Sequence, residues 1–111
     1  MSDTEGPHVV DEPEHNRFAW YENGIRAELL YQRRGSRLTL IHTGVPDELG
    51  GHGVGARLVR AAVESASKDG LILEPWCPFA RQWLLQHRDV AEGIEIDWSS
   101  RPDIRNAGFA P

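Results

Sequence analysis

The sequence predicts a single domain of the α+β class (α/β mixed), in which a mostly antiparallel sheet is packed by two helices. Residues 17–43 alternate polar and apolar side chains with a period of two, which is typical of strands. From Gly53 the apolar residues recur about every 3.6 positions, which is typical of an amphipathic helix. The expected order of elements is β-β-β-α-β-α-β, without an internal repeat.

Three short strands are expected first, joined by tight turns. The first covers Arg17 to Tyr21, and Asn23–Gly24 then favours a two-residue hairpin. The second covers Ile25 to Arg33 and ends at the turn pair Gly35–Ser36. The third covers Arg37 to Thr43.

The third strand leads through a glycine-rich loop into the first helix. Leu38 and Leu40 should share one side of that strand, with His42 as a further candidate for the same side. The inner side of the following helix is formed by apolar residues at helical spacing, and Gly70 is suited to end the helix. These residues are Val54, Leu58, Val59, Ala62, Val63 and Ala66.

The remaining elements are a buried strand, a second helix and a short last strand. The buried strand covers Leu71 to Trp76, and Pro78 suits the first position of the second helix. Phe79, Trp83 and Leu84 are expected on the inner face of that helix. The last strand is expected at Ile94 to Trp98, where the alternation returns.

The ends of the chain lack periodicity and are expected to lie outside the domain. Residues 1–15 contain five acidic residues and neither lysine nor arginine, which predicts a flexible acidic leader. A solvating tail is the preferred interpretation, with an acidic docking arm as the alternative. Residues 16–98 form the expected domain, and residues 99–111 form a C-terminal tail.

Composition excludes several classes of protein. Residues 16–98 contain no basic stripe, so nucleic-acid binding is not expected. No apolar run approaches the roughly 20 residues that a membrane span needs. The single cysteine, Cys77, cannot form an intrachain disulfide and suits a reducing compartment. We therefore expect a cytoplasmic monomer without a membrane association.

The glycine-rich segment Leu49 to Gly55 carries the strongest functional signal. Glycines let successive backbone amides point inward, because no Cβ stands in the way. The helix that follows adds unpaired amides and the positive end of its dipole. Such a turn can bind a phosphate or pyrophosphate, although a loop that merely changes direction would look the same. The chain lacks the Lys-Ser/Thr pair of a P-loop.

In its context the loop resembles that of the GNAT (GCN5-related) N-acetyltransferases. More specifically, the chain is similar to short single-domain GNAT-like proteins that read H-T-E-V-P-x-E-L-R-G-x-G-I-G, then a helix, then C-P-F/Y. The corresponding segments here are His42 to Gly55 and Cys77-Pro78-Phe79. The likeness covers roughly residues 10–98 and implies an acetyl-CoA-dependent N-acetyltransferase with a GNAT-like fold.

The resemblance also implies a binding site for acetyl-CoA, or CoA, as co-substrate. The sheet would open beside the loop, and Val45 would contact the pantetheine through its main chain. Arg57 would reach the 3′-phosphate. Backbone amides would hold the pyrophosphate from Gly51, His52, Gly53, Val54, Gly55 and Ala56.

Two positions depart from the family pattern. Gly44 stands where the family commonly has an acid, which is a natural candidate for a general base. Gly50 stands where it commonly has arginine or glutamine, a further phosphate contact. The first departure puts catalysis in question, and the second weakens the phosphate site.

Cys77 and His42 are the candidates for chemistry. Cys77 lies where a strand meets a helix, and the positive end of the helix dipole favours its thiolate form. It could accept the acyl group, line the thioester pocket, or be a small buried apolar residue. His42 could take a proton from an incoming amine, or be a hydrogen-bonded interior histidine. No His/Cys spacing indicates a metal site.

We therefore predict an acetyl-CoA-binding N-acetyltransferase that acts on an amine. Acetyl transfer would occur by direct attack on the thioester or through Cys77. A chain this short lacks elements that would enclose an acceptor, so an exposed amine is expected, either on a protein or on a small polyamine. The alternatives are a non-catalytic CoA-binding module and a protein-interaction domain of the same fold.

Overall fold

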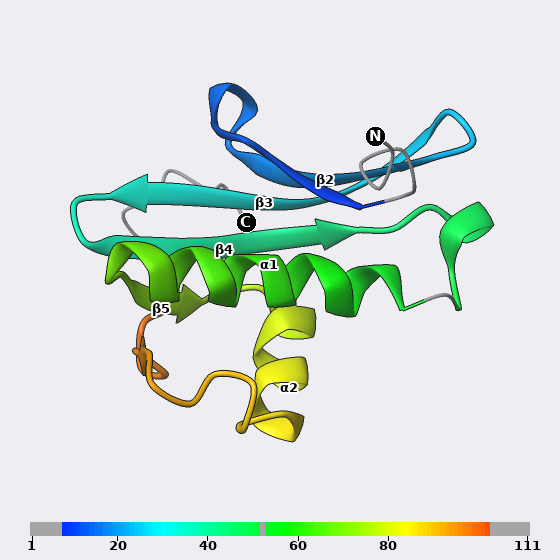
Figure 1. The fold of residues 1–111 in the computed structure, drawn as a ribbon. Coiled ribbons are helices and arrows are strands. Elements are labelled where there is room, and N and C mark those ends of the chain that lie inside the picture. The colour runs from blue at the N-terminus through cyan, green and yellow to red at the C-terminus, as the bar shows by residue number, and fades with distance from the viewer. Residues whose placement is uncertain (1–7, 52, 103–111) are drawn as a thin grey trace.

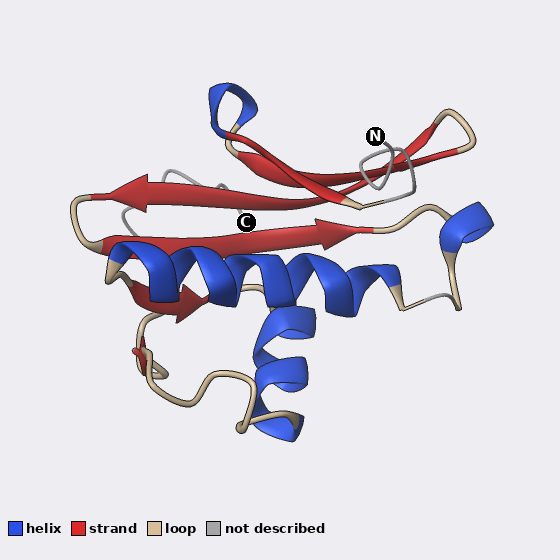
Figure 2. Ribbon diagram, viewed as in Figure 1, coloured by secondary structure: helices blue, strands red, loops and turns tan. Residues whose placement is uncertain are grey.

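The computed structural model describes residues 8–51 and 53–102, which form one sheet with helices packed against it (Figure 1). The six strands lie in chain order, antiparallel from β1 to β4 and parallel from β4 to β6. The predicted α+β class is confirmed, and Figure 2 shows the two types of element. The elements are β1 (Val9–Glu12), β2 (Arg17–Glu22), β3 (Ile25–Arg34), β4 (Arg37–Gly44), α1 (Val54–Asp69), β5 (Ile72–Pro75), α2 (Pro78–Gln86) and β6 (Glu95–Ile96).

Strands β2, β3 and β4 form where alternation and turn residues predict them. Asn23 and Gly24 both have positive φ, as a two-residue hairpin of the primed type requires. In β3, Ala27, Leu29 and Tyr31 are buried on the face that the helices cover. The last strand is shorter than expected, because only Glu95–Ile96 pairs with β5.

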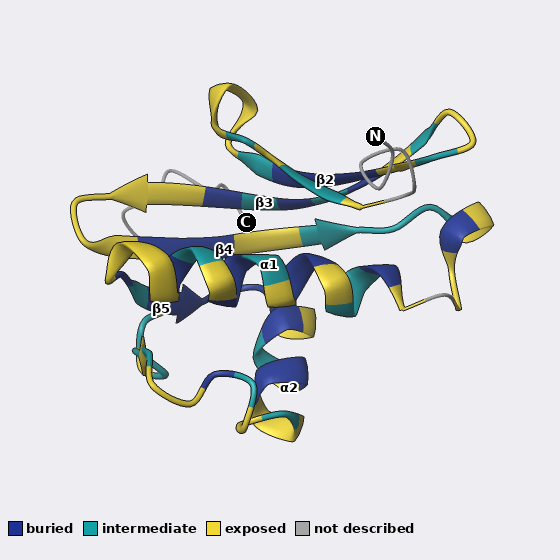
Figure 3. Ribbon diagram, in the orientation of Figure 1, coloured by how far each residue is buried: buried dark blue, intermediate teal, exposed yellow. Residues whose placement is uncertain are grey.

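The two helices pack on the sheet and on each other. Helix α1 contacts β2 and β3, and α2 contacts β4, β5 and α1. Figure 3 shows the alternating buried and exposed stripes of α1. The predicted inner residues of α1 are all buried, and Gly70 ends the helix with φ +67. Because α1 is anchored along the sheet, its N-terminus is held at the end of β4.

The first described residues form a strand, in contrast to the flexible leader that we expected. Val9–Glu12 pairs with β2, and two of its acidic side chains are held by tyrosines. The hydroxyl of Tyr31 donates to Asp11 Oδ1 at 2.6 Å, and the hydroxyl of Tyr21 donates to Glu12 Oε2 at 2.7 Å. Acidic residues that look like solvating groups in the sequence therefore act as hydrogen-bond acceptors at the sheet.

A β-bulge in β4 reverses the direction of its last side chains. Leu40 pairs with Tyr31 and His42 pairs with Leu30, so Ile41 is the extra residue. As a result Thr43, rather than His42, shares the helix-covered face with Leu40. The expectation that His42 lies beside Leu38 and Leu40 is wrong, and Figure 3 shows the change from buried to exposed along β4.

A buried carboxylate joins the opposite face of the sheet to the C-terminal part of the described chain. Glu74 accepts hydrogen bonds from Thr39 Oγ1 at 2.5 Å, Arg37 Nη1 at 2.6 Å and Ser100 Oγ at 3.1 Å. Ser100 Oγ in turn accepts one from Trp76 Nε1 at 2.9 Å. Burial alone would raise the pKa of the Glu74 carboxyl, but these hydrogen bonds lower it below its usual value.

We predict that Glu74 makes stability depend on pH. Its pKa is lower in the folded than in the unfolded chain, so its contribution is present above the unfolded pKa and is lost as pH falls through the folded pKa. Glu74→Gln should cost about 1.5–3 kcal/mol at neutral pH. Urea unfolding should show that the wild type loses more stability than the variant between about pH 7 and about pH 3. Equal losses in the two proteins would contradict this role.

Candidate functional site

The loop between β4 and α1 ends in glycines with positive φ. Gly51 and Gly53 have φ values of +80 and +74, a region that side chains with a Cβ rarely occupy. Gly53 caps α1 without a side-chain hydrogen bond. The first amides of α1 have no acceptor within the helix, so they are available to an anion.

A pocket of about 400 Å³ lies beside this loop. Its volume is in the range of small-molecule sites, and it opens between the end of β4, the loop, the start of α1 and one residue of α2. The lining residues are Thr43, Val45, Leu49, Gly50, Gly51, Gly53, Val54, Gly55, Ala56 and Phe79. The structure therefore brings together six of the residues predicted to bind the cofactor: Val45, Gly51, Gly53, Val54, Gly55 and Ala56.

Arg57, which was also predicted to bind the cofactor, does not line this pocket. Arg57 is exposed one turn into α1, and its guanidinium lies 5.4 Å from the centre of the Trp20 ring. This cation–π contact holds a positive charge near the start of the helix. His52 lies outside the described residues.

Phe79 forms one wall of the pocket, which the sequence analysis did not predict. Trp83 and Leu84 are buried as expected, but Phe79 is 45% exposed. A Cβ on Gly55 would lie 2.8 Å from Phe79 Cζ, closer than real Cβ atoms approach. Gly55 therefore permits the close approach of α2 to α1. The motif Cys77-Pro78-Phe79 contains this residue, but the helical spacing of the apolar residues placed the Phe79 ring in the core.

Cys77 lies directly behind the pocket. It caps α2, with Pro78 at the first helical position as predicted, and its amide donates to Leu40 O at 2.9 Å. Its side chain is 2% exposed, and Sγ lies 3.2 Å from Thr43 Oγ1. Thr43 lines the pocket, whereas Cys77 does not. The contact with Thr43 depends on the bulge at Ile41, which turns this hydroxyl toward the helices.

The two predicted catalytic residues are not brought together. Thr43, on the helix-covered face of β4, contacts Cys77, while its neighbour His42 is exposed on the opposite face. The ladder between β4 and β5 ends at Leu40 and Pro75, so the sheet opens beyond this point. His42 is thus suited to act on a molecule that approaches from the opposite face, and not on the Cys77 thiol.

Neither a metal-ligand cluster nor a membrane-spanning helix is found among the described residues. Among residues 8–51 and 53–102, no three His, Cys, Asp or Glu side chains are grouped so that they could hold a metal ion. Within the same part of the chain, no helix is long and apolar enough to cross a membrane.

The chain matches a known protein family and is similar to a solved structure. A family model described as GCN5-related N-acetyl-transferase matches residues 17–93. The chain is also similar to an NMR solution structure of a GCN5-like protein from Staphylococcus aureus, a candidate N-acetyltransferase. The TM-score is 0.60 and the identity 34%, over 81% of this chain and 86% of that chain. None of the curated proteins matches the chain. The family match includes both the glycine-rich loop and Cys77.

Proposed function

Since the chain belongs to the GCN5-related N-acetyltransferase family, we propose that it binds acetyl-CoA at the glycine-rich loop and transfers the acetyl group to an amine. The observation that carries this proposal is the pocket formed by the loop, the end of β4 and Phe79. We assign the transferase domain to residues 9–98, because β1 extends the sheet beyond the expected start at residue 16. Acetyl-CoA supplies an activated thioester, and the chain supplies the groups that bind and orient it.

The loop fits the anionic part of this co-substrate. Gly51 and Gly53 have positive φ, and apart from their chain neighbours no atom of the described residues would lie within 4 Å of a Cβ at either position. Open space above these glycines leaves room for a pyrophosphate near the first amides of α1. Val45 follows β4 and lines the same pocket, which suits a main-chain contact to the pantetheine. Arg57, held by Trp20, offers a charge for the 3′-phosphate.

An amide NMR titration with acetyl-CoA tests the binding step. Shifts should concentrate at residues 45–57 and 73–79, which contain the loop and the Cys77 junction. Dephospho-CoA should bind more weakly than CoA to the wild type, and Arg57→Gln should reduce that difference. If millimolar acetyl-CoA shifts none of these amides, the proposed function is wrong.

Transfer to the amine is expected to proceed by direct attack on the thioester, because Cys77 is buried and its thiol faces Thr43. Cys77→Ala should therefore keep kcat within about tenfold of the wild type, a loss of about 1.4 kcal/mol or less. Initial rates with radiolabelled acetyl-CoA measure this. Thr43→Val removes the hydroxyl that contacts Cys77 and keeps the side chain at similar size, so it is measured in the same assay.

The covalent route through Cys77 makes the opposite prediction. Cys77→Ala would then abolish turnover, and mass spectrometry of the acid-quenched wild type would find one acetyl group on Cys77. The same assays address the non-catalytic alternative, which the absence of a side chain at Gly44 motivates. A module of that kind would bind acetyl-CoA in the titration and transfer no label to any amine.

A further inference from the structure

The face of the sheet opposite the helices carries two polar side chains directly behind the pocket. Gly44 lies between Thr43 and Val45, which both line the pocket. Glu28 on β3 pairs with Gly44, and His42 precedes it by two residues on the same face. A Cβ on Gly44 would lie 3.9 Å from Glu28 Cγ and 3.8 Å from His42 Nε2. Only the backbone of β4 therefore separates the pocket from the space between these two side chains.

The Glu28 carboxylate is held by two arginines through long ion pairs, so an ammonium ion would compete with them for a closer contact. The carboxylate forms ion pairs with Arg17 Nη1 at 3.8 Å and Arg26 Nε at 3.6 Å, both longer than hydrogen bonds. Arg17 is engaged more closely by Glu12, whose Oε1 lies 2.7 Å from its Nε. Within the described residues, the side chain of Glu28 takes part in these ion pairs and in no closer hydrogen bond.

His42 adds a proton acceptor to the same place. Its side chain is exposed, and a neutral imidazole ring has one nitrogen that can accept a proton. A primary alkyl amine is an ammonium ion at this pH, so it must be bound as a cation and must lose a proton before it can attack. A carboxylate and an imidazole on one face meet these two needs.

We propose that Glu28 and His42 form the acceptor site, and that the acceptor is a primary alkyl ammonium. Glu28 binds the ammonium, and His42 Nε2 takes a proton from it. The neutral nitrogen forms a bond to the thioester carbonyl carbon, the carbon–sulfur bond breaks, and the CoA thiolate leaves and is protonated. The nitrogen loses its second proton to solvent. This inference rests on the proposed acetyl transfer and adds the residues that recognise the amine.

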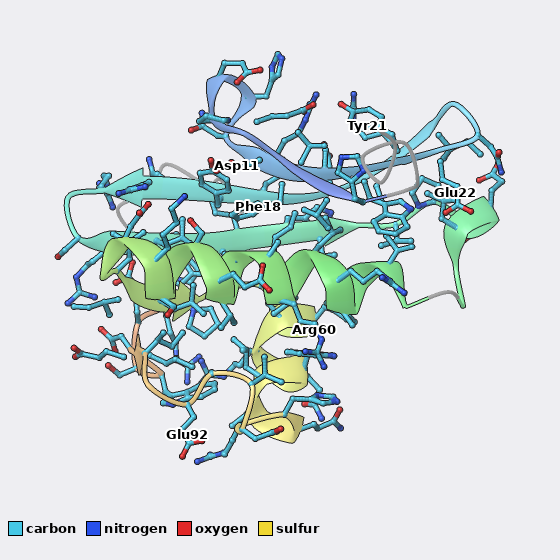
Figure 4. All side chains as sticks on the ribbon, in the orientation of Figure 1. Asp11, Phe18, Tyr21, Glu22, Arg60 and Glu92 are labelled. Carbon is cyan, nitrogen blue, oxygen red and sulfur yellow. The ribbon has the colours of Figure 1, made fainter. Side chains whose placement is uncertain are left out.

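Binding of butylammonium to the CoA-saturated protein tests the role of Glu28. NMR signals of the His42 ring and of the residue 28 amide should shift in the wild type. Glu28→Gln should weaken this binding about tenfold, the effect of losing one charged hydrogen bond. Neutral butanol should not distinguish the two proteins. Glu92→Gln is the matched control, because Glu92 lies on the loop after α2, away from β3 and β4 (Figure 4).

Turnover of butylamine distinguishes the roles of Glu28 and His42. Glu28→Gln should raise the KM for the amine about tenfold, whereas His42→Gln should lower kcat about hundredfold with little change in amine binding. Equal affinities and KM values in the wild type and Glu28→Gln would overturn the role of Glu28. An unchanged kcat in His42→Gln would overturn the role of His42. If the wild type does not bind CoA, the proposed function is refuted, and this acceptor site with it.

Discussion

Replacing Gly53 with valine is expected to weaken acetyl-CoA binding about hundredfold. This is the effect of losing two charge-assisted hydrogen bonds of about 1.5 kcal/mol each. Gly53 has φ +74, where a β-branched residue is strained, and it caps the helix whose first residues line the pocket. Valine would also occupy the open space above the loop, since apart from the chain neighbours no atom of the described residues lies within 4 Å of the Cβ position. Isothermal titration calorimetry measures the change in Kd.

The control for this prediction is Gly35→Val. Gly35 lies in the turn between β3 and β4, has φ +56, and also has open space around its Cβ position. Both variants should lose roughly 1–2 kcal/mol of stability from backbone strain. Only Gly53→Val should lose affinity for acetyl-CoA. If Gly35→Val weakens binding equally, the loss reflects general destabilisation, and the loop is not the binding site.

Local signals were sufficient to predict most of the fold from the sequence. Asn23–Gly24 specified a hairpin that the structure confirms by positive φ at both residues. The inner residues of α1 were identified by spacing, because one face of that helix packs against a sheet. Pro78 located the start of α2, since proline suits the first helical position. Each of these signals depends on residues close together in the chain.

Features that depend on distant residues were missed. Strand β1 pairs with β2, and Tyr31 and Tyr21 hold its Asp11 and Glu12, but no local pattern in residues 1–15 shows these contacts. The bulge at Ile41 is likewise set by the register of β4 against β3. A strict period of two therefore placed His42 on the wrong face.

The same distinction applies to the candidate site. The glycine-rich loop was recognisable, because glycines before a helix have a direct physical meaning, and six of its predicted residues line the pocket. Thr43 and Phe79 were not recognised. Thr43 reaches the pocket only because of the bulge, and Phe79 does so because Gly55 lets α2 approach α1.

The largest expected effect on stability comes from the residue that anchors α1 and thereby the loop. Leu58 is 0% exposed on the inner face of α1. Leu58→Ala should cost about 3 kcal/mol, which lowers Tm by roughly 10–20 °C. Leu85 on α2 is 40% exposed, so Leu85→Ala, the same chemical change, should cost under about 1 kcal/mol. Equal losses of Tm would show that Leu58 does not anchor the helix.

Acetyl-CoA should offset this loss of stability, so the same unfolding measurement also tests the proposed binding of acetyl-CoA. A ligand that binds only the folded state adds about 2.7 kcal/mol of stability at a concentration of 100 times its Kd. Since Leu58 lies on the inner face and does not line the pocket, Leu58→Ala should leave Kd unchanged, so both proteins should gain equally at one acetyl-CoA concentration, 100 times the wild-type Kd. A gain in the wild type alone would mean that Leu58 also holds the loop in its binding conformation. No gain in either protein would contradict binding of acetyl-CoA to the folded chain.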